Sequence, residues 1–286
     1  MAMDDMKGKT VLITGADGGI GREITRALAK QGAALVMACI DADDARPVRE
    51  EIVRESGNSA IEVMQIDLAS LASVRKFAGG FSDRYLQLHV MINNAGVFCA
   101  KRQETADGFE KTIGINYLGP FLLTRLLLPV LRNTPEARIV NVSSNAFAQG
   151  RLDLNNLHLT KGYQGFKAYA NSKLAIVLFT LELAERLKGS GITVNAVHPG
   201  HVATNIWNMW PGKWYQALLF KIIRLFARTP EEAAQNSIFL ATADEVQGVT
   251  GTYFDDRKPK ALSPVCRDVT LRKNLWELSE KLTGLA

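Results

Sequence analysis

The chain has 286 residues, of which 47% are hydrophobic and 22% are charged, with a formal net charge of +5. This balance is typical of a globular protein with a large core, and the length fits a single α/β domain. No block of five or more Lys and Arg indicates a nucleic-acid partner, and the three scattered cysteines indicate neither a disulfide framework nor a zinc site. The first residues contain no apolar signal core, so we expect a cytoplasmic protein. We also expect no bound metal, because Pro199 and Gly200 break the helix that would bring His198 and His201 together.

Short β-branched apolar runs alternate with amphipathic stretches along the chain. These runs predict strands at 10–14, 34–39, 60–67, 88–93, 138–143, 192–198 and 250–256. The amphipathic stretches predict helices at 21–31, 44–56, 70–85, 107–132, 167–188 and 229–242. Continuous apolar strands separated by helices indicate one parallel, doubly wound sheet with helices on both faces. Residues 203–228 resemble an insertion, and 255–286 a charged tail with a helical pattern near its end.

The first predicted strand ends in TGADGGIGRE, where Gly15, Gly19 and Gly21 open a helix. Glycine permits a tight turn and lets backbone N–H groups approach a pyrophosphate, and the helix N-terminus adds a favourable partial charge. A glycine cluster alone can be an ordinary tight turn. Its place directly after an apolar strand favours a nucleotide site.

Tyr169 and Lys173 lie four residues apart in YANSK and share one face of a predicted helix. A nearby ammonium group favours the phenolate and lowers the tyrosine pKa from its reference value of about 10. A tyrosine tuned in this way exchanges a proton with an alcohol or carbonyl oxygen near neutral pH. A surface helix can also carry both residues for solubility alone, so other parts of the chain must decide.

The glycine loop and the YxxxK pair together resemble the short-chain dehydrogenase/reductase family. Further matches follow in order: Asp67 after the third strand, NNAG at 93–96, Asn116 in GINYLG, Ser144 at the end of RIVNVSS, and HPGHVAT at 198–204. The resemblance covers roughly residues 8–250. It is greatest to the retinol-dehydrogenase-like branch, which has a similar extra segment in the long gap between Ser144 and Tyr169.

The resemblance implies a Rossmann fold and an NAD(P)-dependent oxidoreductase that moves a hydride between nicotinamide and an alcohol or carbonyl. Tyr169 would donate or accept the proton, Ser144 would hydrogen-bond the substrate oxygen, and Lys173 would lower the tyrosine pKa. Asn116 would hold a water that links Lys173 to solvent, although a buried structural amide is an alternative. Ser143 could be confused with Ser144, and the family pattern favours the second serine.

The motifs and the resemblance also predict which residues contact the cofactor. These residues are Gly15, Asp17, Gly19, Ile20, Gly21, Ile40, Asp41, Asp67, Leu68, Asn93, Ala95, Gly96, Tyr169, Lys173, Pro199, Gly200, Val202 and Thr204. Asn93 and Gly96 could instead be strand-end turn residues, and Thr204 a helix N-cap.

The end of the second strand bears on the choice of nicotinamide cofactor. Family members that select the 2′-phosphate usually have Arg after the position held here by Cys39, and this chain has Ile40. Members that select NAD often have Asp at the Cys39 position, and that residue is absent too. Asp41 stands about 20 residues beyond the last loop glycine, where a ribose-binding acid is expected. Asp17, Asp41, Asp43 and Asp44 would repel a phosphate dianion, although Arg22 and Arg46 could offset this. We therefore favour NAD slightly over NADP.

Residues 213–228 are unusually apolar and aromatic, with their cations on one helical face. They could form a substrate lid, a packed or dimer-forming helix, or a helix on anionic lipid, and the lid is favoured over peripheral membrane contact. A lid of this composition favours a lipophilic substrate such as a retinoid, steroid or long-chain aldehyde. Family habit suggests a homodimer or homotetramer built on the helices around 107–132 and 169–188.

Two other functions use the same motifs. Nucleotide-sugar epimerases and dehydratases share YxxxK but favour TGxxGxxG, which spaces its glycines differently. Non-catalytic dinucleotide sensors commonly lose the Tyr or the Lys, whereas this chain keeps Ser144, Tyr169, Lys173 and Asn116. The oxidoreductase is therefore the leading hypothesis.

Overall fold

A single sheet organises the computed structural model, which describes residues 6–200 and 229–286. Its strand order is β3-β2-β1-β4-β5-β6-β7-β8. The strands are β1 (Thr10–Thr14), β2 (Ala34–Cys39), β3 (Ile61–Gln65), β4 (Val90–Asn93), β5 (Arg138–Val142), β6 (Thr193–His198), β7 (Thr252–Asp255) and β8 (Lys258–Pro259). Strands β1 to β7 pair in parallel, as predicted. The two-residue β8 pairs antiparallel with β7 and was not predicted, because it has no apolar pattern.

Helices connect the parallel strands. They are α1 (Gly19–Lys30), α2 (Ala42–Ser56), α3 (Leu71–Arg84), α4 (Lys111–Ile113), α5 (Gly119–Arg132), α6 (Gly165–Arg186), α8 (Pro230–Thr242) and α9 (Val269–Thr283). A π-helical turn, η1 (Gly114–Leu118), joins α4 to α5. Short 3-10 turns are η2 (Asn145–Gln149), η3 (Leu154–Asn156), η5 (Asp244–Val246) and η6 (Pro264–Arg267).

Side-chain caps decide several helix boundaries. Thr229 caps α8 in a capping box with Glu232, and Pro230 takes the first helical position, as predicted. The predicted start of a helix at residue 107 was wrong. Glu110 caps the backbone N–H groups of Thr112 and Ile113, so the helix begins at Lys111. The preceding residues form a turn in which Gly108 has a φ of 80°.

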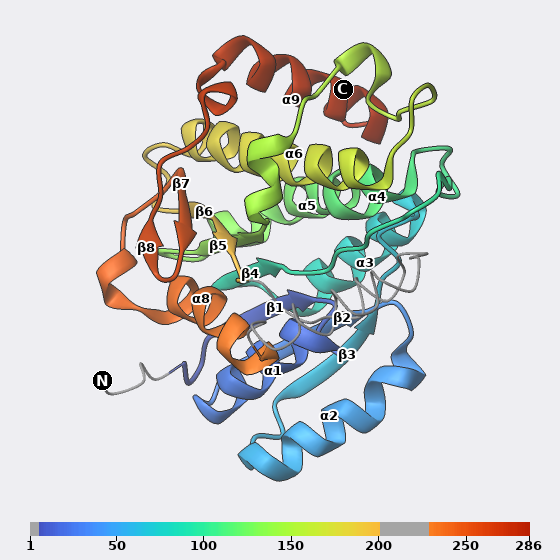
Figure 1. Ribbon diagram of the computed structural model, residues 1–286. Coiled ribbons are helices and arrows are strands. Elements are labelled where there is room, and N and C mark those ends of the chain that lie inside the picture. The colour runs from blue at the N-terminus through green and yellow to red at the C-terminus, as the bar shows by residue number, and fades with distance from the viewer. Residues whose placement is uncertain (1–5, 201–228) are drawn as a thin grey trace.

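Helices cover both faces of the sheet (Figure 1). One core cluster joins the sheet to α1, α2 and α8, and the other joins it to α3, α5, α6 and α9. Successive residues of β1 enter opposite clusters: Leu12 belongs to the second, and Val11 and Ile13 to the first. Each central strand is therefore buried on both faces, which explains its continuous apolar sequence.

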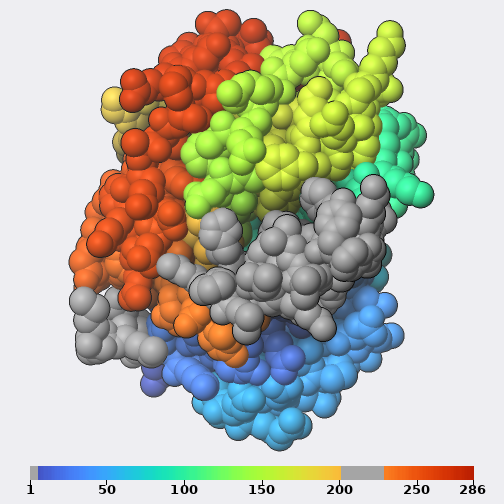
Figure 2. All heavy atoms as spheres, in the orientation of Figure 1, coloured from blue at the N-terminus to red at the C-terminus, as the bar shows by residue number. Residues whose placement is uncertain are grey.

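The C-terminal segment has the helix that its sequence pattern predicted, α9, and this helix packs on the core instead of forming part of a free charged tail. Helix α9 lies on the outer side of α6 and also contacts α5 (Figure 1). It abuts the segment around η3, and Figure 2 shows the two lying against each other on the surface. Trp276 is buried between Phe121 of α5 and Phe179 of α6, with ring centroids 5.2 and 5.9 Å away. Burial of this large apolar ring stabilises the packing of α9 on α5 and α6.

The strand order reverses between β1 and β4, because β3 lies beyond β2 on one side and β5 continues on the other. In open α/β sheets, ligands bind beyond the carboxyl ends of the strands at such a switch point. The fold therefore indicates where a site should be sought. The insertion expected at 203–228 lies outside the described residues.

Candidate active site

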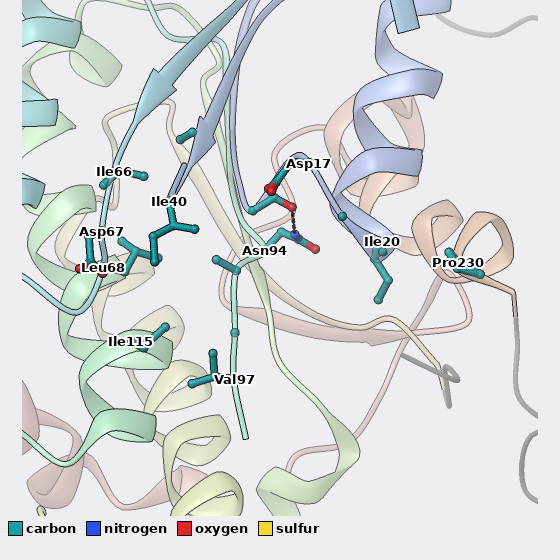
Figure 3. Close-up of a pocket in the computed structure, with 16 residues that line it drawn as sticks. Asp17, Ile20, Ile40, Ile66, Asp67, Leu68, Asn94, Val97, Ile115 and Pro230 are labelled. Atoms are coloured by element: carbon teal, nitrogen blue, oxygen red, sulfur yellow. Dashed lines mark hydrogen bonds between the residues drawn. The ribbon is translucent and has the colours of Figure 1, made fainter. Parts of the chain in front are cut away.

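A cavity of about 570 Å³ opens at the switch point between β1 and β4 (Figure 3). It is lined by Gly15, Asp17, Gly18, Gly19, Ile20, Ala38, Ile40, Ile66, Asp67, Leu68, Asn94, Ala95, Gly96, Val97, Ile115 and Pro230. Most of the cofactor residues expected from the β1–α1 loop and from the ends of β2, β3 and β4 are in this lining. The volume falls within the usual range for ligand pockets.

The loop after β1 has the geometry of a phosphate cradle. Gly15 and Gly19 have φ angles of 63° and 50°, which favour glycine. At Gly21 a Cβ atom would lie 1.9 Å from the carbonyl oxygen of Gly15, so only glycine lets α1 pack against the turn. Gly21 therefore serves close packing and does not line the cavity itself. The first turn of α1 carries N–H groups without intrahelical acceptors, and this arrangement fits the pyrophosphate of a dinucleotide.

The other end of the cavity is formed by residues after β2 and β3. Figure 3 shows Ile40, Asp67 and Leu68 on one side and Ile20 and Pro230 on the other. Ile40 is 65% exposed at the rim. Asp41 is not in the lining, because its carboxylate accepts hydrogen bonds from the backbone N–H groups of Asp43 and Asp44 and caps α2.

Arg22 and Arg46, which could offset the acidic charge at this end of the cavity, both have carboxylate partners. Arg22 pairs with Glu51, and Arg46 pairs with Asp43 at 2.7 Å. Neither guanidinium is a free counter-charge for a phosphate at the rim.

The two asparagines after β4 have different tasks. Asn93 is buried and donates hydrogen bonds to Thr124 Oγ1 (3.1 Å) and Asn141 Oδ1 (2.8 Å), so it joins β4 to the core and does not line the cavity. Asn94 lines the cavity and donates to the carbonyl oxygen of Thr14 at 2.9 Å. From the motif NNAG we predicted that Asn93 contacts the cofactor. In the structure it is the next residue, Asn94, that lines the cavity.

Gly96 connects the cavity to the predicted catalytic residues. A Cβ atom at this position would lie 3.4 Å from Asn116 Oδ1 and 3.5 Å from Lys173 Nζ. A larger side chain would press on both groups. The predicted catalytic amide and amine thus lie directly behind the cavity wall.

Tyr169 and Lys173 lie on α6 with the amine beside the phenol ring, 5.5 Å from its centroid. Lys173 Nζ donates to the carbonyl oxygen of Val142 at 3.1 Å. The hydroxyl of Ser144, just beyond β5, lies beside the Tyr169 phenol and lowers its pKa. Ser143 instead donates to the backbone carbonyl of Lys173 at 3.0 Å and is buried. The structure therefore brings Ser144, and not Ser143, to the phenol.

Asn116 lies in the π-helical turn η1, a geometry that often marks functional sites. Its Oδ1 accepts from the Val97 N–H (2.7 Å), and its Nδ2 donates to the Val97 carbonyl (2.9 Å) and to Ser172 Oγ (3.0 Å). These bonds join η1, the β4 loop and α6. The side chain therefore has the contacts of the buried structural amide that the sequence left as an alternative.

Burial controls the ionisation of Tyr169 and Lys173. It raises the pKa of Tyr169, and the hydrogen bond from Ser144 offsets only part of this rise. Burial also lowers the pKa of Lys173 from its usual 10.5 to about 8. The sequence led us to expect a tyrosine pKa lowered by the nearby ammonium and further by a bound nicotinamide, whereas burial of the phenol raises this pKa in the protein described here.

Several neighbours of the catalytic residues were missed by sequence reasoning. Tyr253 of β7 is buried and donates to Asn145 Oδ1 at 2.9 Å, directly beside Ser144. The Phe98 ring meets Tyr169 edge-on, with centroids 5.9 Å apart. Neither residue belongs to a short motif, and both reach the site only through tertiary contacts.

The extra segment between Ser144 and Tyr169 is docked beside the site. Tyr163 donates to the carbonyl oxygen of Cys99 at 2.6 Å, which ties this segment to the β4 loop. A second cavity of about 460 Å³, lined by residues 97–101, Gln103 and Lys111, shares Val97 with the first. Its lining includes the ring of Phe98.

The remaining predicted residues follow β6. Pro199 and Gly200 stand at its carboxyl end, and Gly200 has a φ of 97° that favours glycine. Val202 and Thr204 lie outside the described residues. Within residues 6–200 and 229–286, no group of three or more His, Cys, Asp and Glu could hold a metal. The stretch Lys111–Arg132 is long and apolar enough to cross a membrane, but 78% of its most apolar window is buried inside the protein, as in a core helix.

Comparison with known proteins decides the family. A family model described as short chain dehydrogenase matches residues 9–213. The chain belongs to this family. As a short-chain dehydrogenase it is an oxidoreductase that acts on CH–OH groups with a nicotinamide cofactor, and the cradle at α1 fits such a dinucleotide.

The relatives of this short-chain dehydrogenase include human retinol dehydrogenase 11 (41% identity over 98% of this chain and 87% of the relative) and human retinol dehydrogenase 12 (42% over 98% and 88%). Among solved structures, an uncharacterized protein from Mycobacterium Paratuberculosis matches with a TM-score of 0.81 at 33% identity, covering 99% of this chain and 96% of that one. The Pseudomonas aeruginosa RhlG/NADP active-site complex matches with a TM-score of 0.70 at 26% identity, covering 88% and 96%. The dehydrogenase thus has the retinol-dehydrogenase-like sequence that its motifs indicated.

Proposed function

We propose that this dehydrogenase interconverts a lipophilic alcohol and its carbonyl compound, with Tyr169 as the proton donor and acceptor. The observation that carries the proposal is that the Ser144 hydroxyl and the Lys173 amine both lie beside the Tyr169 phenol, with the amine 5.5 Å from the ring centroid. A substrate oxygen placed between the two hydroxyls would receive one hydrogen bond from each. The nicotinamide would supply or accept the hydride.

The three side chains have separate tasks in this proposal. Ser144 orients the substrate oxygen, because its hydroxyl lies beside the phenol. Tyr169 gives its proton to that oxygen in reduction, a direction that suits a phenol held protonated by burial. Lys173, with a pKa of about 8, carries its charge at neutral pH and stabilises the phenolate left behind.

The substrate class follows from the relatives and from the apolar surroundings. Retinol dehydrogenases 11 and 12 are named for a lipophilic alcohol. Phe98 stands edge-on to the reactive phenol, and the extra segment is tied down beside it by Tyr163. A panel of retinoids, steroids and long-chain aldehydes, read at the nicotinamide absorbance with each cofactor, tests this. We expect turnover of at least one lipophilic substrate, and turnover only of small polar alcohols would contradict it.

For the cofactor we propose a preference for NAD over NADP. Ile40 offers no charge at the rim of the cavity, and Arg22 and Arg46 are engaged by carboxylates. Asp17, in the lining, would repel a 2′-phosphate. The similar RhlG structure is a complex with NADP. The proposed preference of this chain for NAD therefore depends on its own residues at the rim of the cavity.

We further propose a cytoplasmic enzyme with at most peripheral membrane association, which vesicle sedimentation with phosphatidylserine would test. A homo-oligomer stays a prediction. Helix α9 packs on α6 and α5, so we propose that any oligomer uses another surface than the faces of these helices that α9 covers. Crosslinking of the full chain, read by mass spectrometry, would contradict this if intersubunit links ended on the faces of α5 and α6 that α9 covers.

A further inference from the structure

A buried hydrogen bond joins the C-terminal helix to the catalytic region. The hydroxyls of Tyr117 and Ser279 lie 2.7 Å apart, although the residues are 162 positions apart in sequence. Tyr117 is 1% exposed and Ser279 is 0% exposed. The bond is therefore shielded from water, where losing a partner costs more than at the surface.

The direction of this bond follows from the other partner of Ser279. The Ser279 hydroxyl donates to the carbonyl oxygen of Leu275 at 2.7 Å, so its single proton is already used. Tyr117 must then be the donor and Ser279 the acceptor. Burial raises the pKa of Tyr117, which keeps its proton in place.

Tyr117 belongs to the π-helical turn that carries Asn116. The Asn116 amide holds Val97 of the β4 loop and Ser172 of α6, the residue directly before Lys173. Ser172 in turn donates to the backbone carbonyl of Tyr169 at 2.8 Å. A shift of the π-turn would therefore move the backbone next to both members of the catalytic pair.

Helix α9 has anchors of its own, so Ser279 is a fixed point. Arg272 binds the buried Glu182 at 2.8 Å, and Glu280 pairs with Arg125. The Trp276 ring lies between two guanidinium groups, those of Arg125 at 4.7 Å and Arg186 at 4.3 Å. These contacts hold α9 to α5 and α6 independently of Tyr117.

We propose that Tyr117 and Ser279 are positioning residues. Through their hydrogen bond, α9 holds the π-turn in the position where Asn116 can bond both Val97 and Ser172. The C-terminal helix would then contribute to turnover although no residue of it has been placed at the cavity. This inference rests on the proposed roles of Tyr169 and Lys173, and it gives Asn116 the role of joining the π-turn to their helix.

The test compares Tyr117→Phe, Ser279→Ala and the double variant with two reference variants of the full chain. Thr283→Val is the matched control, because Thr283 is a buried α9 hydroxyl that donates to the Ser279 carbonyl at 2.6 Å, and its side-chain bonds within the described part of the chain stay inside α9. Asn116→Ala measures the proposed site itself. Steady-state kinetics are combined with amide hydrogen exchange in peptides that cover residues 111–119.

We expect Tyr117→Phe and Ser279→Ala each to lower kcat about three- to tenfold, the effect of one buried hydrogen bond, with KM changed less than about twofold. The double variant should be no worse than the worse single variant, because both remove the same bond. Exchange should rise in residues 111–119 in these variants and stay at the wild-type level in Thr283→Val.

Two outcomes would overturn the inference in different ways. If Asn116→Ala keeps the wild-type kcat, the proposed role of Asn116 falls, and the inference falls with it. If Asn116→Ala loses activity while the Tyr117 and Ser279 variants match Thr283→Val in kcat and exchange, the proposed site stands and only the positioning role is overturned. Should Tyr117→Phe fail to fold, Ser279→Ala, which deletes a single oxygen, decides the question.

Discussion

At the scale of single residues, burial and hydrogen bonding oppose each other at the catalytic pair. Desolvation raises the pKa of the Tyr169 phenol, and the Ser144 hydroxyl lowers it. Desolvation also lowers the pKa of the Lys173 amine, because a buried ammonium has lost its water. Both groups are therefore pushed toward their neutral forms, and a bound dinucleotide must supply part of the charge that the phenolate needs.

The buried amine makes stability depend on pH. Between pH 8 and 10.5 the unfolded chain binds a proton at Lys173 that the folded protein has lost, so the free energy of unfolding rises with pH across this window. Lys173→Met removes this titration. From pH 7.5 to 10 we expect the wild type to gain about 2–3 kcal/mol relative to the variant in urea unfolding. Lys167 is an exposed lysine on the same helix, and Lys167→Met serves as the control. Its difference in unfolding free energy from the wild type should not change with pH. A difference for Lys173→Met that also stays constant with pH would contradict the prediction.

Ile40 is the residue on which the cofactor preference is proposed to depend. Ile40→Arg would place a guanidinium at the rim of the cavity, where a 2′-phosphate would lie. A charge-assisted hydrogen bond of about 1.5–3 kcal/mol predicts a roughly 10- to 100-fold rise in kcat/KM for NADP relative to NAD. Ile40→Gln, which is polar but uncharged, is the control. An unchanged NAD/NADP ratio in Ile40→Arg would contradict the placement of this residue.

At the scale of elements, the cap of α2 explains why one predicted cofactor residue is not in the cavity. Asp41 accepts two backbone N–H bonds at the start of the helix. We expect Asp41→Ala to lower the free energy of unfolding by about 1 kcal/mol, and Asp41→Ser, which can still cap, by only a few tenths. The KM for NAD should not change in either variant. A large rise of this KM in both would restore the ribose-binding role that the sequence suggested.

Local patterns predicted the elements well, and tertiary contacts account for what they missed. Seven strands and the parallel sheet were predicted from apolar runs, and the Thr229 cap from a local motif. The helix start at 107 was wrong because Glu110 caps three residues later. Of the site, the glycine loop, Ser144, Tyr169 and Lys173 belong to local motifs.

Tyr253 and the Tyr117–Ser279 bond could not be found in this way. Their partners lie more than 100 residues away, and no local pattern records such a contact. The rise in the pKa of Tyr169 has the same origin, because the burial that causes it comes from the whole fold. Local motifs therefore predict which groups are candidates for the reaction, whereas tertiary packing determines the pKa values of these groups.

At the scale of the whole molecule, α9 completes the core on one side of the sheet. Trp276 packs on Phe121 and Phe179 and lies against two guanidinium groups. We expect Trp276→Ala to lower the free energy of unfolding by about 3–5 kcal/mol, measured by urea denaturation. Val269→Ala, at a 46% exposed position of the same helix, should change it by less than about 0.5 kcal/mol. A loss below about 1 kcal/mol for Trp276→Ala would show that α9 is dispensable to the core.

The sheet, the docked extra segment and α9 together hold one phenol beside one cavity, and the account depends on that phenol. The most direct measurement is the kcat of Tyr169→Phe with the best lipophilic substrate, alongside dinucleotide affinity and circular dichroism. Loss of a positioned acid–base group predicts a fall of about 100-fold or more in kcat, with dinucleotide binding and fold retained. Undiminished turnover by the folded variant would contradict the account.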